Sequence, residues 1–171
     1  MKGFKRVSKV TLLLLALVIP ALAAGPTIVD NPLTSFVIPA AVGCGTFDVT
    51  GAPEVGKPNG GRIIMFFNQQ GVLVSEIVHG ATFVTLTNTS NGNSINLNIS
   101  GPGKISFTSN TEVIFGPTLF LEFPANVTPH NLQGIAFATG QTGIQFDNSG
   151  NIISVSFVGN TPQPSVCALL E

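Results

Sequence analysis

Residues 80–100 show the clearest alternation of apolar and polar positions in the chain. The second half of this stretch reads Ser94-Ile95-Asn96-Leu97-Asn98-Ile99-Ser100. A period of two is typical of a strand with one buried face and one solvated face. Asn91-Gly92 separates the two halves and is the preferred pair for a two-residue type I′ turn. The pattern therefore predicts a hairpin in which Val84 lies opposite Ile99 and Leu86 lies opposite Leu97.

A second hairpin is predicted over residues 104–115, with its turn at Ser109-Asn110-Thr111. Matching the apolar residues of its two strands places Ile105 opposite Phe115 and Phe107 opposite Val113.

The two registers together align Gly80, Gly103 and Pro117 across neighbouring strands. Glycine allows a strand to bend sharply, and proline cannot donate a hydrogen bond to the ladder. We therefore expect the sheet to bend along this line.

The inward face of these central strands is predicted to carry nine apolar residues. They are Val84, Leu86, Ile95, Leu97, Ile99, Ile105, Phe107, Val113 and Phe115.

The rest of the chain continues as short strands separated by turn residues, and no window shows a helical period. Residues 24–61 look irregular, apart from Phe36-Val37-Ile38 and a short strand at 46–49, and residues 51–61 read as a loop. Further strands are expected at 62–67, 72–78, 118–123, 134–138, 143–146 and 152–157. The fold class is thus all-β, an antiparallel up-and-down meander that closes as a curled barrel. A two-sheet β-sandwich is the alternative.

The first 23 residues are expected to form a secretory signal peptide rather than part of the fold. Basic residues precede a short apolar run at 11–19, and Ala21-Leu22-Ala23 offers small residues for cleavage after Ala23. An uncleaved membrane anchor is the alternative, but the run is shorter than the roughly 20 residues that a bilayer needs. No second long apolar run follows. We expect one all-β domain at 24–171, secreted and extracellular, with no membrane span after cleavage.

The net charge of the mature chain limits the classes of partner that we expect it to bind. Three basic residues remain after cleavage against all 8 acids, so the net charge is 3 − 8 = −5. This balance argues against nucleic acid and anionic membranes as partners.

Cys44 and Cys167 are the only cysteines. In an exported protein such a pair is expected to form a disulfide. A metal or redox pair is the alternative, but the two residues are far apart and no CxxC motif is present.

Side chains that could carry chemistry are scattered. Two isolated histidines, His79 and His130, lack the further ligands of a metal site, so we expect no metal and no cofactor. No spacing selects a catalytic pair among the acids, and Ser100-Gly101 lacks the flanks of a nucleophile elbow. The acids in question are Asp48, Glu54 and Glu122.

Two other motifs have plain structural explanations. Residues 147–151 resemble a calcium loop only faintly and are expected to form a hairpin turn. Asn88, Asn98 and Asn126 begin glycosylation sequons, which matter only if the host glycosylates. The chain contains no Trp or Tyr, and this argues against a sugar-binding module.

Several short motifs resemble those of a family of small secreted bacterial β-proteins that is uncharacterised and has one N-to-C-terminal cysteine pair. The resemblance rests on turns and cysteines, so it implies architecture and export but no site residues. The motifs are residues 38–44, His79-Gly80, residues 98–103, residues 146–151 and residues 166–170.

Three functions follow as hypotheses. The first is a secreted non-catalytic β-domain that acts at or outside the cell surface. The second is a barrel that binds a small apolar ligand, as calycin-like carriers do. The third is an enzyme with a site at the barrel mouth, cyclase-like or dirigent-like, and only the predicted fold supports it.

Overall fold

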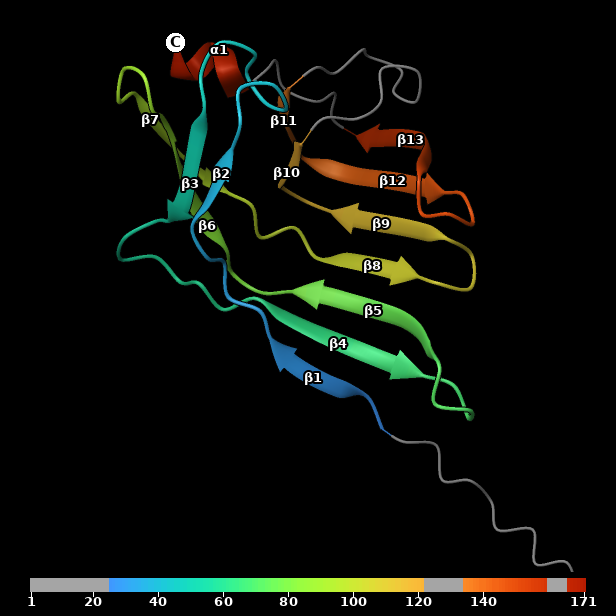
Figure 1. Cartoon of the computed structure of the whole chain (residues 1–171). Helices are drawn as coiled ribbons and strands as arrows, with labels where there is room; N and C mark the ends of the chain where they lie inside the picture. Colours follow the sequence, from blue (N-terminus) through green and yellow to red (C-terminus); the bar gives the residue numbers. More distant parts are fainter. Residues whose placement is uncertain (1–24, 122–133, 160–165) are drawn as a thin grey trace, which may run out of the picture.

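The computed structural model describes residues 25–121, 134–159 and 166–171, and these form an all-β fold with one short helix (Figure 1). The elements are β1 (Thr27–Asp30), β2 (Phe36–Ile38), β3 (Val49–Pro53), β4 (Arg62–Phe67), β5 (Leu73–His79), β6 (Phe83–Asn88), β7 (Ser94–Asn98), β8 (Gly103–Ser106), β9 (Thr111–Phe115), β10 (Thr118–Leu121), β11 (Ile135–Ala138), β12 (Gly140–Phe146), β13 (Ile152–Gly159) and α1 (Val166–Leu170).

The strands form three antiparallel sheets. A seven-stranded sheet has the order β1-β4-β5-β8-β9-β12-β13, a four-stranded sheet has the order β2-β3-β6-β7, and β10 pairs with β11. The predicted all-β, antiparallel class is confirmed. The described strands close no barrel, because β1 and β13 end opposite edges of the large sheet. The barrel is therefore not confirmed, and the two-sheet alternative fits the arrangement.

Two long hairpins each contribute to more than one sheet. The pairs β5–β8 and β6–β7 share one register, as Val78 opposite Gly103 and Phe83 opposite Asn98 show. The pairs β9–β12 and β10–β11 share another. Each hairpin thus leaves the seven-stranded sheet partway along its length and enters a smaller sheet.

A row of glycines marks the line where the hairpins leave the large sheet. When the observed strand pairings are continued beyond the strand ends at this line, six glycines lie side by side. Each strand of the seven-stranded sheet except β1 leads into one of them. They are Gly61, Gly80, Gly101, Gly116, Gly140 and Gly159. The predicted bend line therefore exists, but it passes through Gly101 and Gly116 rather than Gly103 and Pro117.

Steric room explains glycine at part of this line, and positive φ explains it at Gly116, Gly140 and Gly159. A Cβ on Gly80 would lie 2.2 Å from the carbonyl oxygen of Gly60, and one on Gly101 would lie 2.6 Å from that of Pro117. Gly80 also has a φ of +134°, which residues with a side chain rarely adopt. The backbones can approach this closely only because no side chain intervenes.

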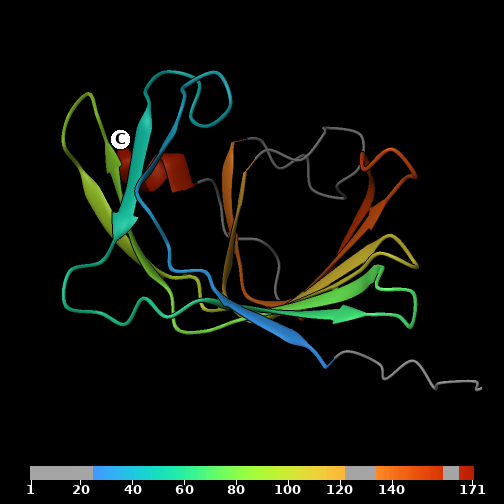
Figure 2. The ribbon, with the colours of Figure 1, turned by 60° about the horizontal axis from the view of Figure 1, so that its bottom comes forward.

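The β10–β11 pair stands between the two larger sheets (Figure 2). Because successive residues of a strand point to opposite faces, this pair serves two cores. Leu119, Ile135 and Phe137 pack toward the first core, while Phe120, Ala136 and Ala138 belong to the second.

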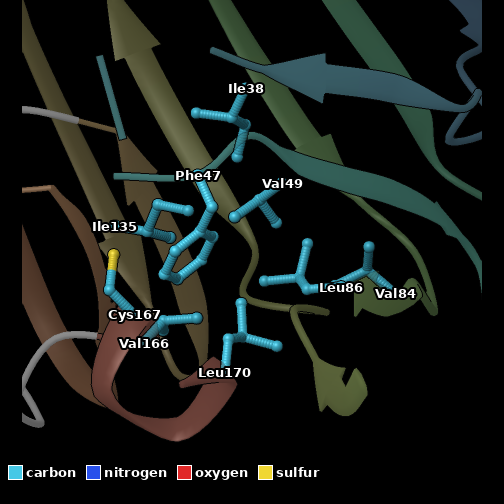
Figure 3. Close-up of a cluster of buried hydrophobic side chains, with 9 residues drawn as sticks. All are labelled: Ile38, Phe47, Val49, Val84, Leu86, Ile135, Val166, Cys167 and Leu170. Carbon is cyan, nitrogen blue, oxygen red and sulfur yellow. The ribbon is translucent and has the colours of Figure 1, made fainter. Parts of the chain in front are cut away.

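The first core joins the four-stranded sheet, β11 and α1 (Figure 3). Val84 and Leu86 are fully buried in it, as predicted, and Leu97 packs against it from the neighbouring strand. Asn96 and Asn98 are exposed, so the predicted face of this hairpin is confirmed. The buried members are Ile38, Phe47, Val49, Val84, Leu86, Ile135, Val166, Cys167 and Leu170.

The register of the first hairpin differs from the prediction by two residues. Val84 pairs with Leu97 and Leu86 with Ile95. Gly92 alone takes positive φ in the turn, whereas a type I′ turn needs two such residues. The Asn88 amide bonds instead to the Asn93 carbonyl oxygen, which gives a longer loop. A register shift of two residues leaves the same side chains on the buried face, so the predicted buried face is correct although the register is not.

The register of the second hairpin differs by three residues, which reverses one strand's faces. Ile105 pairs with Glu112, not Phe115. Phe107 and Phe115 were predicted to point inward, but they are 45% and 49% exposed. The Phe107 amide continues the ladder to Val74, so the turn spans residues 107–110.

The N-terminal part is more regular than the sequence suggested. β1 pairs with β4, and β3 extends through Pro53, inside the predicted loop. Both strands depend on partners distant in the sequence. The short helix α1 was also not predicted, because its five residues are too few to show the apolar periodicity of a helix.

Candidate ligand groove at the hairpin ends

A groove of about 470 Å³ lies where two hairpin loops meet at one end of the strands of the seven-stranded sheet. One loop joins β8 to β9 and the other joins β12 to β13 (Figure 1). This volume is within the range typical of small-molecule sites. The lining residues are Ile105, Ser106, Phe107, Asn110, Thr111, Glu112, Phe146, Asp147, Asn148, Ser149 and Gly150.

Local sequence determines the shape of both loops. Asn110 adopts a φ of 52°, a conformation that asparagine tolerates better than most residues. Asp147 organises the other loop, because its Oδ1 accepts hydrogen bonds from the amides of Ser149 and Asn151. Gly150 takes positive φ there, so residues 147–151 form the predicted hairpin turn.

Hydrogen bonds join the two loops to each other. Asn110 Nδ2 donates to Asn148 Oδ1 at 3.0 Å. Gln145 Nε2 donates to the carbonyl oxygens of Ser109 and Asn110 at 3.1 Å and 2.9 Å. These hydrogen bonds hold the two loops at the rim of the groove together before any ligand binds, which lowers the entropic cost of binding.

Inside the groove, apolar side chains lie beside the carboxyl group of Glu112. Ile105, Glu112 and Phe146 occupy the same face of the sheet, because the strand pairing places Glu112 between Ile105 and Ile144. Phe107 adds an exposed ring beside them.

The two acids of the groove have opposite electrostatic environments. Burial raises the pKa of Glu112, because desolvation disfavours the charged form. No hydrogen bond or ion pair to another described residue offsets this for Glu112. Asp147 has a lowered pKa, caused mainly by the side-chain amide of Asn151 and then by backbone amides of the turn.

This arrangement suits binding better than acid–base chemistry. Both carboxylate oxygens of Asp147 already accept hydrogen bonds within their own turn, Oδ2 from Asn151 Nδ2 at 2.9 Å. The lowered pKa of Asp147 therefore reflects turn stabilisation. Glu112 is the group that remains available to a ligand. No three metal-ligating side chains gather anywhere in the described part of the chain.

His79 lies away from this groove, at the glycine row. It lines two adjoining clefts of about 260 and 390 Å³, the larger shared with Asp30 and Arg62. Arg62 Nε contacts Asp30 Oδ1 at 3.2 Å, and both side chains are well exposed. Glu76 and His79 lie on opposite faces of β5, as a spacing of three requires. His130 lies outside the described residues.

The structure does not bring the other candidate residues together into a site. Asp48 accepts a hydrogen bond from the Ala40 amide, and Ser100 bonds through its side chain to the backbone of Thr82. These are structural roles. Glu54 lines none of the clefts described here, and Glu122 lies outside the described residues.

The disulfide between Cys44 and Cys167 is present and confirms the predicted pair. It joins the segment after β2 to α1 with a Cα–Cα distance of 5.3 Å.

The sequon asparagines differ in accessibility. Asn88 is only 2% exposed, and its Nδ2 donates to the Leu170 carbonyl oxygen at 3.1 Å, so the folded chain offers no room for a glycan there. Asn98 is exposed. Asn126 lies outside the described residues.

Sequence reasoning missed Glu112 as a site residue because the predicted register placed it on the wetter face. The missed signal was Asn110, whose tolerance of positive φ fits the last position of a four-residue loop. That loop would have paired Ile105 with Glu112.

No protein-family model matches the chain, and no curated protein or solved structure shows significant similarity to it. Helices long and apolar enough to cross a bilayer do not occur in the described ranges.

Proposed function

We propose that this protein is a secreted, non-catalytic β-domain that acts at or outside the cell surface. The observation that carries the proposal is the disulfide between Cys44 and Cys167, which spans 123 residues of sequence. Disulfides of this kind persist in oxidising compartments. The N-terminal segment also supports export, because basic residues and an apolar run precede small residues before Ala24, as in a secretory signal peptide.

Export is testable by expressing the full chain with its own leader in a bacterial host. We expect a product that begins at Ala24, recovered outside the cytoplasm with no free thiol. A matched variant without residues 1–23 should remain in the cytoplasm with reduced cysteines. A full-length product retained in the membrane, or free thiols in the exported product, would contradict the proposal.

The groove favours binding of a small apolar ligand as a second candidate function. Its apolar walls and cross-linked rim suit such a role, although the site lies at hairpin ends and not inside a barrel. Titration with a neutral amphiphile such as octan-1-ol, followed by NMR, would test this role. Shifts confined to residues near the groove would support it, and no saturable shift would count against it.

A further inference from the structure

We propose that the groove selects ligands that carry a positive charge on an apolar body, such as alkyl or arylalkyl amines, and that Glu112 is the residue that selects them. This inference rests on the second candidate function, namely that the groove binds an apolar ligand. It adds the chemical class of the ligand and the residue that recognises it.

The groove places the Glu112 carboxyl group beside three apolar side chains, among lining residues that also include Ser106, Asn110, Thr111, Asn148 and Ser149. Ile105 lies directly opposite Glu112 in the strand pairing, and Phe146 and Phe107 complete the apolar lining. Gly103 on β8 has no side chain to touch this carboxylate, whereas a Cβ built there would lie in van der Waals contact with Glu112 Oε1, at 3.8 Å. A ligand can thus place its hydrocarbon against the walls and its charged end at the carboxylate.

The charge of the surroundings favours a cation. The acids near this face are Glu112 itself, Asp147 on the rim and Glu76, which pairs with Ile105 from the other side. Among described basic residues none lines the groove. Lys104 neighbours Ile105 in the strand and therefore points to the opposite face. An anionic ligand would meet only like charge here.

The absence of a protein partner for Glu112 among the described residues explains why the carboxylate should discriminate. A partly buried carboxylate without a partner carries a desolvation cost, and a ligand cation would offset that cost on binding. Asp147 cannot replace it, because both of its oxygens serve the turn.

The test is a titration of the ¹⁵N-labelled exported protein with octylammonium, octan-1-ol and octanoate at neutral pH. The three probes share one chain and differ in charge. We expect octylammonium to bind roughly tenfold or more tightly than octan-1-ol, as for a charge-assisted hydrogen bond, and octanoate to bind most weakly. Shifts should centre on residues 105–112 and 146–150.

Two isosteric variants identify the responsible residue. Glu112→Gln should reduce octylammonium binding to the level of octan-1-ol while octan-1-ol binding stays unchanged, which also shows that the groove remains folded. Glu76→Gln is the matched control, because Glu76 occupies the same face but does not line the groove. It should leave the preference for octylammonium intact.

The outcomes separate this inference from the function on which it rests. Equal binding of octylammonium and octan-1-ol, or an unchanged preference in Glu112→Gln, would overturn charge selection but leave an apolar-ligand site. If none of the three probes binds, both ideas fail.

Discussion

At the scale of single residues, Glu112 lies in an environment that disfavours its charged form. It is an acid on an apolar face, partly buried and without a described partner. Neighbouring strands contribute Gly103 and Ile105 on one side and Ile144 on the other, while the other acids of this face and its groove are Glu76 and Asp147. Residues that destabilise a fold in this way are often retained for function.

The raised pKa of Glu112 predicts a pH-dependent cost. Glu112 keeps its proton to a higher pH in the folded state than in the unfolded chain. Proton binding by Glu112 therefore stabilises the fold fully below the unfolded pKa of about 4.3, and this stabilisation is lost as the pH rises through the folded pKa. Glu112→Gln should therefore match the wild type in acid and exceed its unfolding free energy near neutrality. Urea unfolding across this pH range measures the difference.

Glu76→Gln provides the control for this prediction. It removes the same charge from the same sheet face, but outside the groove. An equal gain in both variants near neutrality would assign the effect to the charge of the face and not to Glu112. If Glu112→Gln were less stable than the wild type near neutrality, the carboxylate would be stabilised by a partner in the folded state, and the predicted desolvation cost would be wrong.

At the scale of elements, two long hairpins pass from the seven-stranded sheet into a smaller sheet at the row of six glycines. Each hairpin keeps one register across the row, so the strands pass from sheet to sheet without losing alignment. Backbones approach closely at Gly61, Gly80 and Gly101 of the row, and the β10–β11 pair beyond it contributes side chains to both cores.

A substitution within the row should be costly for steric reasons alone. Gly101 has ordinary φ, but a Cβ there would lie 2.6 Å from the Pro117 carbonyl oxygen, so Gly101→Ala should destabilise the fold by about 1–3 kcal/mol, as overpacking does. Thermal unfolding followed by circular dichroism would measure this loss.

Gly60→Ala is the matched control for Gly101→Ala. Gly60 adjoins the row and also lacks positive φ, yet a Cβ there would meet nothing within 4 Å. It should be neutral or slightly stabilising. Equal losses in the two variants would mean that close packing does not explain the row.

At the scale of the whole molecule, the disulfide and α1 tie the C-terminal end to the first core. Val166, Cys167 and Leu170 are buried there. The Leu170 carbonyl oxygen accepts hydrogen bonds from Asn88, Asn91 and Asn93 of the β6–β7 loop. The end of the described chain thus shapes a loop almost eighty residues earlier.

Breaking the disulfide should weaken the whole fold. Its sequence separation of 123 residues corresponds to an estimated chain-entropy stabilisation of about 4–5 kcal/mol. The Cys44→Ser, Cys167→Ser double variant should lose unfolding free energy of that order in urea. Reduced wild type is the comparison, and it should behave alike. Unchanged midpoints in both would show that α1 docking holds without the bond.

The amino-acid sequence by itself determined the all-β class, the antiparallel hairpins, the buried face of Val84 and Leu86 and the cysteine pair. These features depend on local periodicity, turn residues and composition, which a sequence displays directly. Glycines also indicated a bend at Gly80, although the line crosses the neighbouring strands at Gly101 and Gly116 and not at the predicted Gly103 and Pro117.

Only the tertiary structure decided the registers, the division into sheets and the groove. The Asn91-Gly92 motif favours a tight turn, but contacts between this loop and α1 stabilise a longer one. The ladder from Phe107 to Val74 likewise set the second hairpin and turned Glu112 toward the groove. A register is chosen by partners that lie far away along the chain, and a shift of one residue reverses every side chain of a strand.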